Sequence, residues 1–381
     1  MLAQHLTPNT QMKIGIDARL NAYRQGGIPQ YTRQLLEALA PLAPGDQFVA
    51  LQHRRQLRPL VVAPNLRRAT LYTPPHHRLE QLSLPLELLP LGLSLLHCPD
   101  FIPPLRRPCP AVITVHDLAF LRYPEILDDS ARRYYGQIHA AAHSAEAVIA
   151  VSESTRRDIA ELLDLPPARV DLVYEAAAPH FRPLELAPDA SHTINGQTLV
   201  AGSFLLFVST LEPRKNLPTL LAALRHCLDR RPAVAYRLVL AGARGWRASP
   251  IFETIRELRL AEAVTLLDSV SQDDLLWLYN ACRMYANPSR YEGFGLPVLE
   301  ALACAAPALV ANTSSLPEVA GEAAILLPPD DVQAWADAIE ELWENETRRA
   351  KLAQLGPAQA AGFSWQRAAR ETLAIYRRVG R

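Results

Sequence analysis

The stretch SFLLFVSTLEPRKNLPTLLAALRHCL, residues 203–228, contains a short apolar run, a polar turn and a longer run in that order. Phe204 to Val208 is apolar and has the length of a strand, whereas the segment after Asn216 has the pattern of a helix that Asn216 can cap. The same order of strand, turn and helix recurs along most of the chain. This alternation predicts an α/β fold in which helices cover both faces of parallel sheets.

The predicted strands fall into two groups. They cover residues 13–18, 48–52, 69–72, 93–98, 112–115, 147–151 and 170–174, and then 204–208, 237–241, 264–267, 284–286, 308–311 and 324–327. The pattern lapses in the polar stretch 183–202. We therefore expect two doubly wound Rossmann-like domains facing across a cleft, 1–185 and 203–362, joined by a linker at 186–202.

Composition excludes several classes of protein. The 381 residues are 49% apolar and carry 39 basic and 39 acidic side chains, which excludes a disordered tail protein and a generally basic nucleic-acid binder. The apolar runs are too short to span a bilayer. Residues 1–11 lack the pattern of an export signal, and Met12 is an alternative start. Five widely spaced cysteines favour buried free thiols and a cytoplasmic location.

Charge is unevenly distributed along the chain. Residues 1–110 contain 12 Lys and Arg against 6 Asp and Glu, an excess of +6. One interpretation is that the first domain faces an anionic partner. The alternative is a general preference for arginine as the surface cation, because only three lysines accompany 36 arginines.

Two cations follow the strand of the opening stretch. Arg214 and Lys215 stand between that strand and its helix, so they are expected to project from the carboxyl edge of the sheet. An arginine fork and a lysine point charge suit a diphosphate, including the charge that develops on a leaving diphosphate. The alternative is a solvated pair in a loop.

A second motif, PSRYEGFGLPVLE at residues 288–300, places two glutamates in and after a glycine-rich loop. Glu292 is flanked by Gly293 and Gly295, where backbone amides can cradle oxygens. Pro297 suits the first position of a helix, which puts Glu300 in the first turn. In a cleft, Glu300 can accept two hydroxyl donors of a ribose, although its ordinary role there is to stabilise the helix dipole.

Two weaker signals lie in the first half. Gly26-Gly27 between a strand and a helix can bring backbone close to an anion, but a glycine pair is more often only a turn. His116-Asp117 directly follows a strand that is predicted to be buried, where a histidine either binds a ligand or has a structural partner. No Cys/His group has zinc spacing and no Asp-x-Asp occurs, so we expect neither a metal nor a cofactor.

Taken together, these motifs resemble those of the retaining nucleotide-sugar glycosyltransferases of family 4, in the two-Rossmann-domain GT-B architecture, especially their bacterial mannosyltransferase-like members. The resemblance runs from Ile14 to about Tyr376. Besides the motifs above, it includes the Val151-Ser-Glu-Ser run, Asn312-Thr-Ser-Ser-Leu-Pro-Glu-Val-Ala-Gly321 and Phe363-Ser-Trp.

The resemblance implies roles for particular residues. Arg214 and Lys215 would hold the donor diphosphate and the Gly27 loop would approach it, Glu292 would face the donor sugar, and Glu300 would bind the ribose. His116 would meet the sugar near the reacting carbon. The remaining expected contacts with the donor come from the backbone of Gly293, Phe294, Gly295 and Leu296, and from Ser269 beside the base. The segment 363–381 would form a helix that crosses back to the first domain.

The sequence also departs from the family pattern. Pro29-Gln30 stands where Gly-Arg is common, which removes one cation near the phosphates, and Ala305-Ala306 replaces a frequent glycine. Two alternatives stay open, a catalytically silent glycosyltransferase-like scaffold and a nucleotide-sugar epimerase. The expected reaction is transfer of a hexose, preferably mannose from GDP-mannose, to a hydroxyl of a glycan or polyprenyl-diphosphate-linked acceptor. The basic first domain suggests peripheral contact with the inner face of the cytoplasmic membrane.

Overall fold

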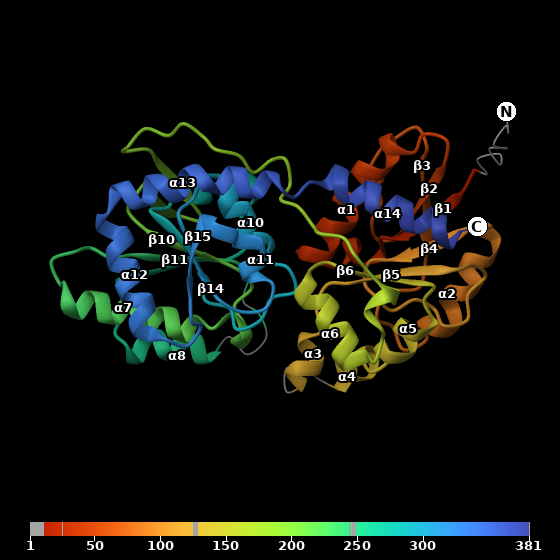
Figure 1. The fold of residues 1–381 in the computed structure, drawn as a ribbon, viewed down its shortest axis with the longest axis horizontal. Helices are drawn as coiled ribbons and strands as arrows, with labels where there is room; N and C mark the ends of the chain where they lie inside the picture. Colours follow the sequence, from red (N-terminus) through yellow and green to blue (C-terminus); the bar gives the residue numbers. More distant parts are fainter. Residues whose placement is uncertain (1–10, 25, 125–128, 244, 246–248, 381) are drawn as a thin grey trace, which may run out of the picture. The chain divides into compact units, whose positions relative to one another are not determined.

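The chain folds into two α/β units, which Figure 1 shows as ribbons. The first comprises Met1–Glu175 together with Trp365–Arg381, and the second comprises Ala176–Ser364. The structure, a computed structural model, describes residues 11–24, 26–124, 129–243, 245 and 249–380. Residues 1–10, for which no export signal is expected, lie outside this part. The predicted α/β class with two doubly wound parallel sheets is confirmed.

The first unit contains a parallel sheet of seven strands in the order β3-β2-β1-β4-β5-β6-β7. The strands are β1 (Lys13–Asp17), β2 (Gln47–His53), β3 (Leu66–Leu71), β4 (Leu95–Cys98), β5 (Ala111–Val115), β6 (Ala147–Ala150) and β7 (Val170–Leu172). Its helices are α1 (Gly27–Leu42), α2 (Glu80–Leu88), α3 (Ala119–Arg122), α4 (Asp129–Tyr135), α5 (Ile138–Ser144), α6 (Glu153–Leu163) and α14 (Trp365–Val379), with 3-10 turns η1 (Arg19–Ala22), η2 (Leu89–Leu91) and η4 (Pro167–Arg169).

Both faces of this sheet are buried. Ile113 and Val115 of β5 belong to a core that also includes Leu84 of α2 and Ile159 of α6. Successive side chains of a strand point to opposite faces, so Val112 and its equivalents face the helices of the other layer. Figure 1 shows α1 and α14 side by side in that layer. Double burial explains why the central strands β4, β5 and β6 are mostly apolar.

The second unit contains a parallel sheet of six strands in the order β12-β11-β10-β13-β14-β15. These are β10 (Leu205–Val208), β11 (Leu238–Ala241), β12 (Val264–Leu267), β13 (Met284–Asn287), β14 (Ala308–Ala311) and β15 (Ala324–Leu327). Its helices are α7 (Leu217–Arg230), α8 (Ser249–Glu257), α9 (Gln272–Ala281), α10 (Leu296–Ala303), α11 (Leu316–Ala320), α12 (Val332–Glu344) and α13 (Glu346–Ala361), with turns η5 (Pro213–Lys215) and η6 (Gly321–Ala323).

The segment predicted as a linker is folded. Strands β8 (Ser191–Ile194) and β9 (Gln197–Val200) form an antiparallel hairpin within the second unit. Asn195 and Gly196 make its turn with φ of +50° and +79°, which the Asn-Gly dipeptide allows because both residues tolerate the left-handed region. The predicted boundary at 185/186 also differs from the structure, where the first unit ends at Glu175.

Two further features bear on the expectations. All five cysteines are buried free thiols, as predicted. Among the helices of the described residues, none combines the length and apolar character that crossing a bilayer requires.

Candidate functional site

Most of the predicted site residues of the second unit follow strands next to the point where the strand order of its sheet reverses. The strand order turns between the neighbours β10 and β13, with β14 next to β13. Arg214 and Lys215 follow β10, Glu292 follows β13, and Ser314 and Ser315 follow β14. Ligands of open parallel sheets bind at such a reversal, beyond the carboxyl ends of the strands.

Lys215 and Arg214 converge on the carboxylate of Glu292. The Lys215 Nζ atom donates to Glu292 Oε1 at 2.7 Å and to Oε2 at 2.9 Å. Arg214 Nη1 reaches Glu292 Oε2 at 3.2 Å, while its Nε atom pairs with Glu212 Oε1 at 2.8 Å. The structure thus brings together three of the four predicted catalytic residues. It also gives Glu292 a structural role, as the counter-ion of two cations, which the sequence did not indicate.

The ion pair between Lys215 and Glu292 is buried. Lys215 and Glu292 are 6% and 7% exposed. Burial alone would raise the pKa of Glu292, but the charges of Lys215 and Arg214 outweigh it and lower the pKa to about 2. Burial and the neighbouring Arg214 charge lower the pKa of Lys215, against the opposing effect of Glu292. An anion entering this cluster would meet two cations held by one carboxylate.

Three serines fix the loop that carries Glu292. Ser289 Oγ donates to Glu292 Oε1 at 2.8 Å, and the Glu292 amide donates to Ser314 Oγ at 2.9 Å. The hydroxyl of Ser315 donates to the carbonyls of Glu292 and Phe294 at 2.9 and 2.8 Å. The loop that carries Glu292 is therefore tied to the loop after β14.

Gly295 sets the start of helix α10. Its φ of +104° lies in the region that favours glycine, and a Cβ there would come within 2.9 Å of the Leu316 side chain. Leu296 is the first helical residue, so its amide belongs to the group that has no partner within the helix. Phe294 is buried and its ring meets Phe363 edge-on, while Gly293 is buried beside it.

Glu300 lies one residue deeper in the helix than predicted. Helix α10 begins at Leu296, so Pro297 is its second residue and no acidic residue falls in the first turn. Glu300 is 5% exposed and accepts a 3.0 Å hydrogen bond from the hydroxyl of Tyr279 on α9. The first-turn interpretation is therefore wrong, because the helix starts one residue earlier than Pro297 suggested. One carboxylate oxygen is oriented by Tyr279.

One other expectation differs from the structure. Asn216 precedes α7, but its side chain makes no cap; its amide donates to the Pro329 carbonyl at 2.7 Å and its oxygen accepts from Thr219 Oγ1 at 3.0 Å. The left-handed backbone of Asn216, with φ of +55°, explains why it does not cap. Ser269 follows the edge strand β12 and is exposed. Its contact with the base stays a prediction.

His116, the fourth predicted catalytic residue, follows β5 in the first unit. Its Nδ1 atom pairs with Glu175 Oε1 at 2.7 Å, and its ring packs edge-on against Tyr31 at 4.7 Å between centroids. Nε2 is buried and has no hydrogen-bond partner within the described residues. An imidazole held by a carboxylate on one side presents its other nitrogen to a ligand. Gly27 begins α1 in the same unit and is exposed.

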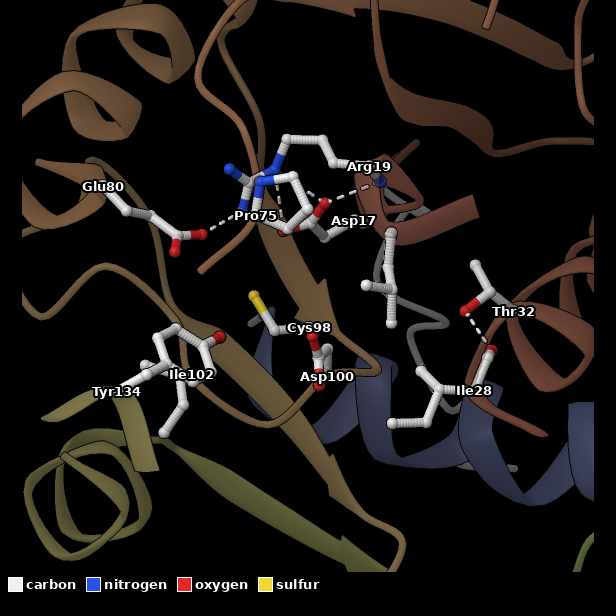
Figure 2. A pocket seen from close by; sticks show the side chains of 11 residues that line it. Asp17, Arg19, Ile28, Thr32, Pro75, Glu80, Cys98, Asp100, Ile102 and Tyr134 are labelled. Atoms are coloured by element: carbon white, nitrogen blue, oxygen red, sulfur yellow. Dashed lines mark hydrogen bonds and ion pairs between the residues drawn. The ribbon is translucent and has the colours of Figure 1, made fainter. Parts of the chain in front are cut away.

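Figure 2 shows a pocket of the first unit. It lies where the strand order of the first sheet reverses, between β1 and β4. The Arg19 guanidinium joins Asp17 and Glu80 there, and Oε2 of Glu80 is buried without a partner in the described chain. Burial outweighs the charge of Arg19 and raises the pKa of Glu80. The lining residues are Asp17, Arg19, Leu20, Ile28, Thr32, Pro75, Glu80, Cys98, Asp100, Ile102 and Tyr134. The interior of the pocket has room for about one water-sized group.

Sequence reasoning missed the residues that hold the predicted ones. Ser289 lies inside the quoted glycine-rich motif and Ser315 inside the 312–321 motif. The motifs therefore included both serines, but they did not indicate that these serines bond to Glu292. Tyr279 and Glu175 gave no sequence signal, because their contacts with Glu300 and His116 join distant segments. Across the described residues, no group of three or more His, Cys, Asp or Glu side chains is placed to hold a metal ion.

The sequence matches two family models. Residues 25–178 match Glycosyltransferase Family 4, and residues 199–359 match Glycosyl transferases group 1. The O-antigen chain mannosyltransferase B of Escherichia coli is 32% identical over 74% of this chain and 73% of its own length. This chain belongs to glycosyltransferase family 4. It is also 32% identical, over 69% of its length, to the serotype-specific mannosyltransferase WbdA of Escherichia coli, of which the match covers only 33%.

Solved structures share the fold of this glycosyltransferase. Sucrose-phosphate synthase from Thermosynechococcus elongatus has a TM-score of 0.75 at 19% identity, covering 97% of this chain and 99% of its own. HepE from Anabaena, solved with UDP and glucose, has a TM-score of 0.69 at 18% identity, covering 97% and 100%. At these identities the likeness concerns the fold, which is GT-B.

Proposed function

We propose that this glycosyltransferase moves mannose from GDP-mannose to a hydroxyl of a glycan or polyprenyl-diphosphate-linked acceptor, with retention at the anomeric carbon and without a metal ion. The observation that carries the proposal is the convergence of Lys215 and Arg214 on Glu292 at the reversal of the second sheet. The mannosyltransferase names of the relatives favour mannose as the sugar.

The two cations would bind the donor diphosphate. Charge-assisted contacts from a lysine and an arginine stabilise the charge that develops as the bond between the anomeric carbon and the diphosphate oxygen breaks. Glu292 keeps both cations in place before the donor arrives and would face the sugar afterwards. The amides of Gly293 to Leu296 and the carboxylate of Glu300 would hold sugar or phosphate oxygens and the ribose diol.

The acceptor hydroxyl would attack the same face of the sugar that the diphosphate leaves. A bond forms between the anomeric carbon and the acceptor oxygen, and the acceptor proton passes to an oxygen of the leaving diphosphate. The products are GDP and the mannosylated acceptor. From the first unit, His116 would contribute its Nε2 atom, which has no hydrogen-bond partner within the described residues.

Calorimetric titration with GDP, UDP, ADP and their sugar conjugates in EDTA tests this function first. We expect binding of GDP and GDP-mannose in preference to the others. NMR of slow donor hydrolysis should then release the sugar with its anomeric configuration kept. Inversion would contradict the proposed mechanism, and a requirement for added metal would contradict the metal-free site. Nucleotide binding without any turnover would instead favour the catalytically silent scaffold.

A further inference from the structure

Helix α2 exposes a row of leucines. Leu79 directly precedes the helix, Leu82 and Leu86 lie within it, and Leu89 follows it, with exposed fractions of 48%, 70%, 68% and 59%. Their spacing of three, four and three residues places all four on one side of a helix. We call these four residues the leucine row. Figure 1 shows α2 at the margin of the first unit.

The opposite side of α2 already packs against the protein. Leu84 and Leu88 are 1% and 0% exposed and belong to the core beneath the sheet. The helix is therefore apolar on both sides, whereas an ordinary surface helix has one apolar and one polar side. Single exposed leucines are common, but four in one row indicate a surface that meets another apolar phase.

The acidic residues near the row are turned away from it. Glu80 pairs with Arg19 inside the pocket, and Glu87 accepts hydrogen bonds from the amides of Tyr72 and Thr73 at 2.6 and 2.9 Å. Asp100 pairs with His76. These are all the carboxylates between residues 72 and 108, so the row has no exposed negative charge from this stretch.

Arginines border the leucine row. Arg78 is exposed immediately before Leu79. Arg106 is exposed next to Leu105, whose amide donates to Gln81 of α2 at 2.8 Å. Neither arginine forms an ion pair within the described residues. Leucines bordered by unpaired arginines match the boundary between the acyl chains and the head groups of an anionic bilayer.

We propose that the leucine row docks this enzyme on the surface of a bilayer that contains anionic lipids, with the leucines at the acyl boundary and Arg78 and Arg106 on the lipid phosphates. A second copy of the chain fits less well, because two such surfaces would bring four arginines together with no carboxylate between them. The inference builds on the proposed lipid-linked acceptor, but it concerns a surface separate from the nucleotide site.

Vesicle flotation of the full chain tests the proposal. Vesicles of phosphatidylcholine alone are compared with vesicles of phosphatidylcholine and phosphatidylglycerol in equal parts, at low and high salt. We expect binding to the anionic vesicles that weakens with salt. The double variant Leu82→Gln/Leu86→Gln should lower the partition constant about tenfold or more, because two apolar side chains no longer leave water. Arg78→Glu/Arg106→Glu should abolish the preference for phosphatidylglycerol.

The matched control is Leu42→Gln/Val62→Gln, which changes two exposed apolar side chains beside the end of α1. It should float like the wild type. Failure of the wild type to bind anionic vesicles, or wild-type binding by the leucine variant, would overturn the proposal. So would a lipid-free dimer that the leucine variant dissociates, detected by analytical ultracentrifugation. GDP titration without vesicles reports on the proposed function separately, and the leucine variant should leave that result unchanged.

Discussion

At the scale of single residues, one carboxylate connects the architecture of the site to its chemistry. Glu292 compensates the buried charge of Lys215 and part of that of Arg214, and a serine hydroxyl orients it. Removing one member of such a buried set leaves the other charges without compensation, so its effects on stability and on activity are mixed. Stability and activity are therefore measured separately for each variant of these residues.

Lys215→Ala is expected to lower kcat/KM about 10- to 150-fold, because it removes one charge-assisted contact worth roughly 1.5 to 3 kcal/mol to the diphosphate. Steady-state kinetics with the donor measures the loss. Lys351→Ala is the control, since it removes an exposed lysine from α13. The double variant Lys215→Ala/Glu292→Gln should recover stability without activity, because the buried carboxylate that lost its nearest cation is replaced by a neutral amide. Full activity of Lys215→Ala would remove Lys215 from the donor site.

The pH dependence of stability should report on Glu292. Its pKa is lowered from 4.5 to about 2, so the ionised form stabilises the fold above pH 4.5 and this contribution disappears as the pH falls towards 2. The contribution is about 3 kcal/mol. In urea unfolding at neutral pH, the wild type should have a higher free energy of unfolding than Glu292→Gln. In acid, this difference should shrink by about 3 kcal/mol. A constant difference between pH 5 and pH 2 would contradict the pairing.

Tyr279 is a positioning residue for Glu300. Tyr279→Phe removes the buried hydrogen bond to Glu300 Oε2, so we expect the KM for the donor to rise about three- to tenfold with a smaller change in kcat. Initial-rate kinetics at varied donor concentration separates the two constants. Tyr236→Phe provides the control for losing a buried phenol, since it lies on another part of the second unit. Equal effects of both variants would mean that only packing is affected.

At the scale of elements, local pattern predicted the strands well. Apolar runs bounded by turn residues located all thirteen strands of the two parallel sheets. The signal is clearest for the central strands, because strands buried on both faces have no polar side. The β8–β9 hairpin was missed although Asn195-Gly196 is a strong turn signal, because its strands are polar and mostly exposed.

The terminal helix α14 offers a test at this scale. Arg377 Nη1 pairs at 3.0 Å with Asp46, which is 2% exposed, whereas Arg378 Nη1 pairs at 3.0 Å with the more exposed Asp171. Arg377→Ala should lower the free energy of unfolding of the first unit by about 2 kcal/mol, because a buried carboxylate loses its charged partner and keeps only the Met12 amide. Arg378→Ala should cost less than about 1 kcal/mol. Urea unfolding measures both, and equal losses would contradict the difference in burial.

At the scale of the whole molecule, each sheet carries its polar cluster at the point where strand order reverses. Lys215 and Glu292 lie there in the second unit, and the pocket around Arg19 and Glu80 lies there in the first. Strands on either side of a reversal send their following loops in opposite directions, which opens space for a ligand. The two units thus provide two distinct polar sites.

Hydrogen exchange with and without GDP should distinguish these sites. We expect slower amide exchange in residues 212–216 and 289–300, because the nucleotide would cover these loops and stabilise the unit that binds it. The sheet of the first unit should exchange at an unchanged rate. Mass spectrometry of peptides from both units provides the comparison, and protection confined to the first unit would place the nucleotide elsewhere.

The sequence by itself determined the α/β class, the strands and the identity of the chemical groups at their ends. Those features depend on local periodicity and residue type, which a linear pattern contains. Only the tertiary structure decided that Lys215 and Arg214 pair with Glu292, that Tyr279 orients Glu300, and that Glu175 holds His116. These contacts join segments from 21 to 78 residues apart, and no local pattern encodes which distant polar groups will share a buried space.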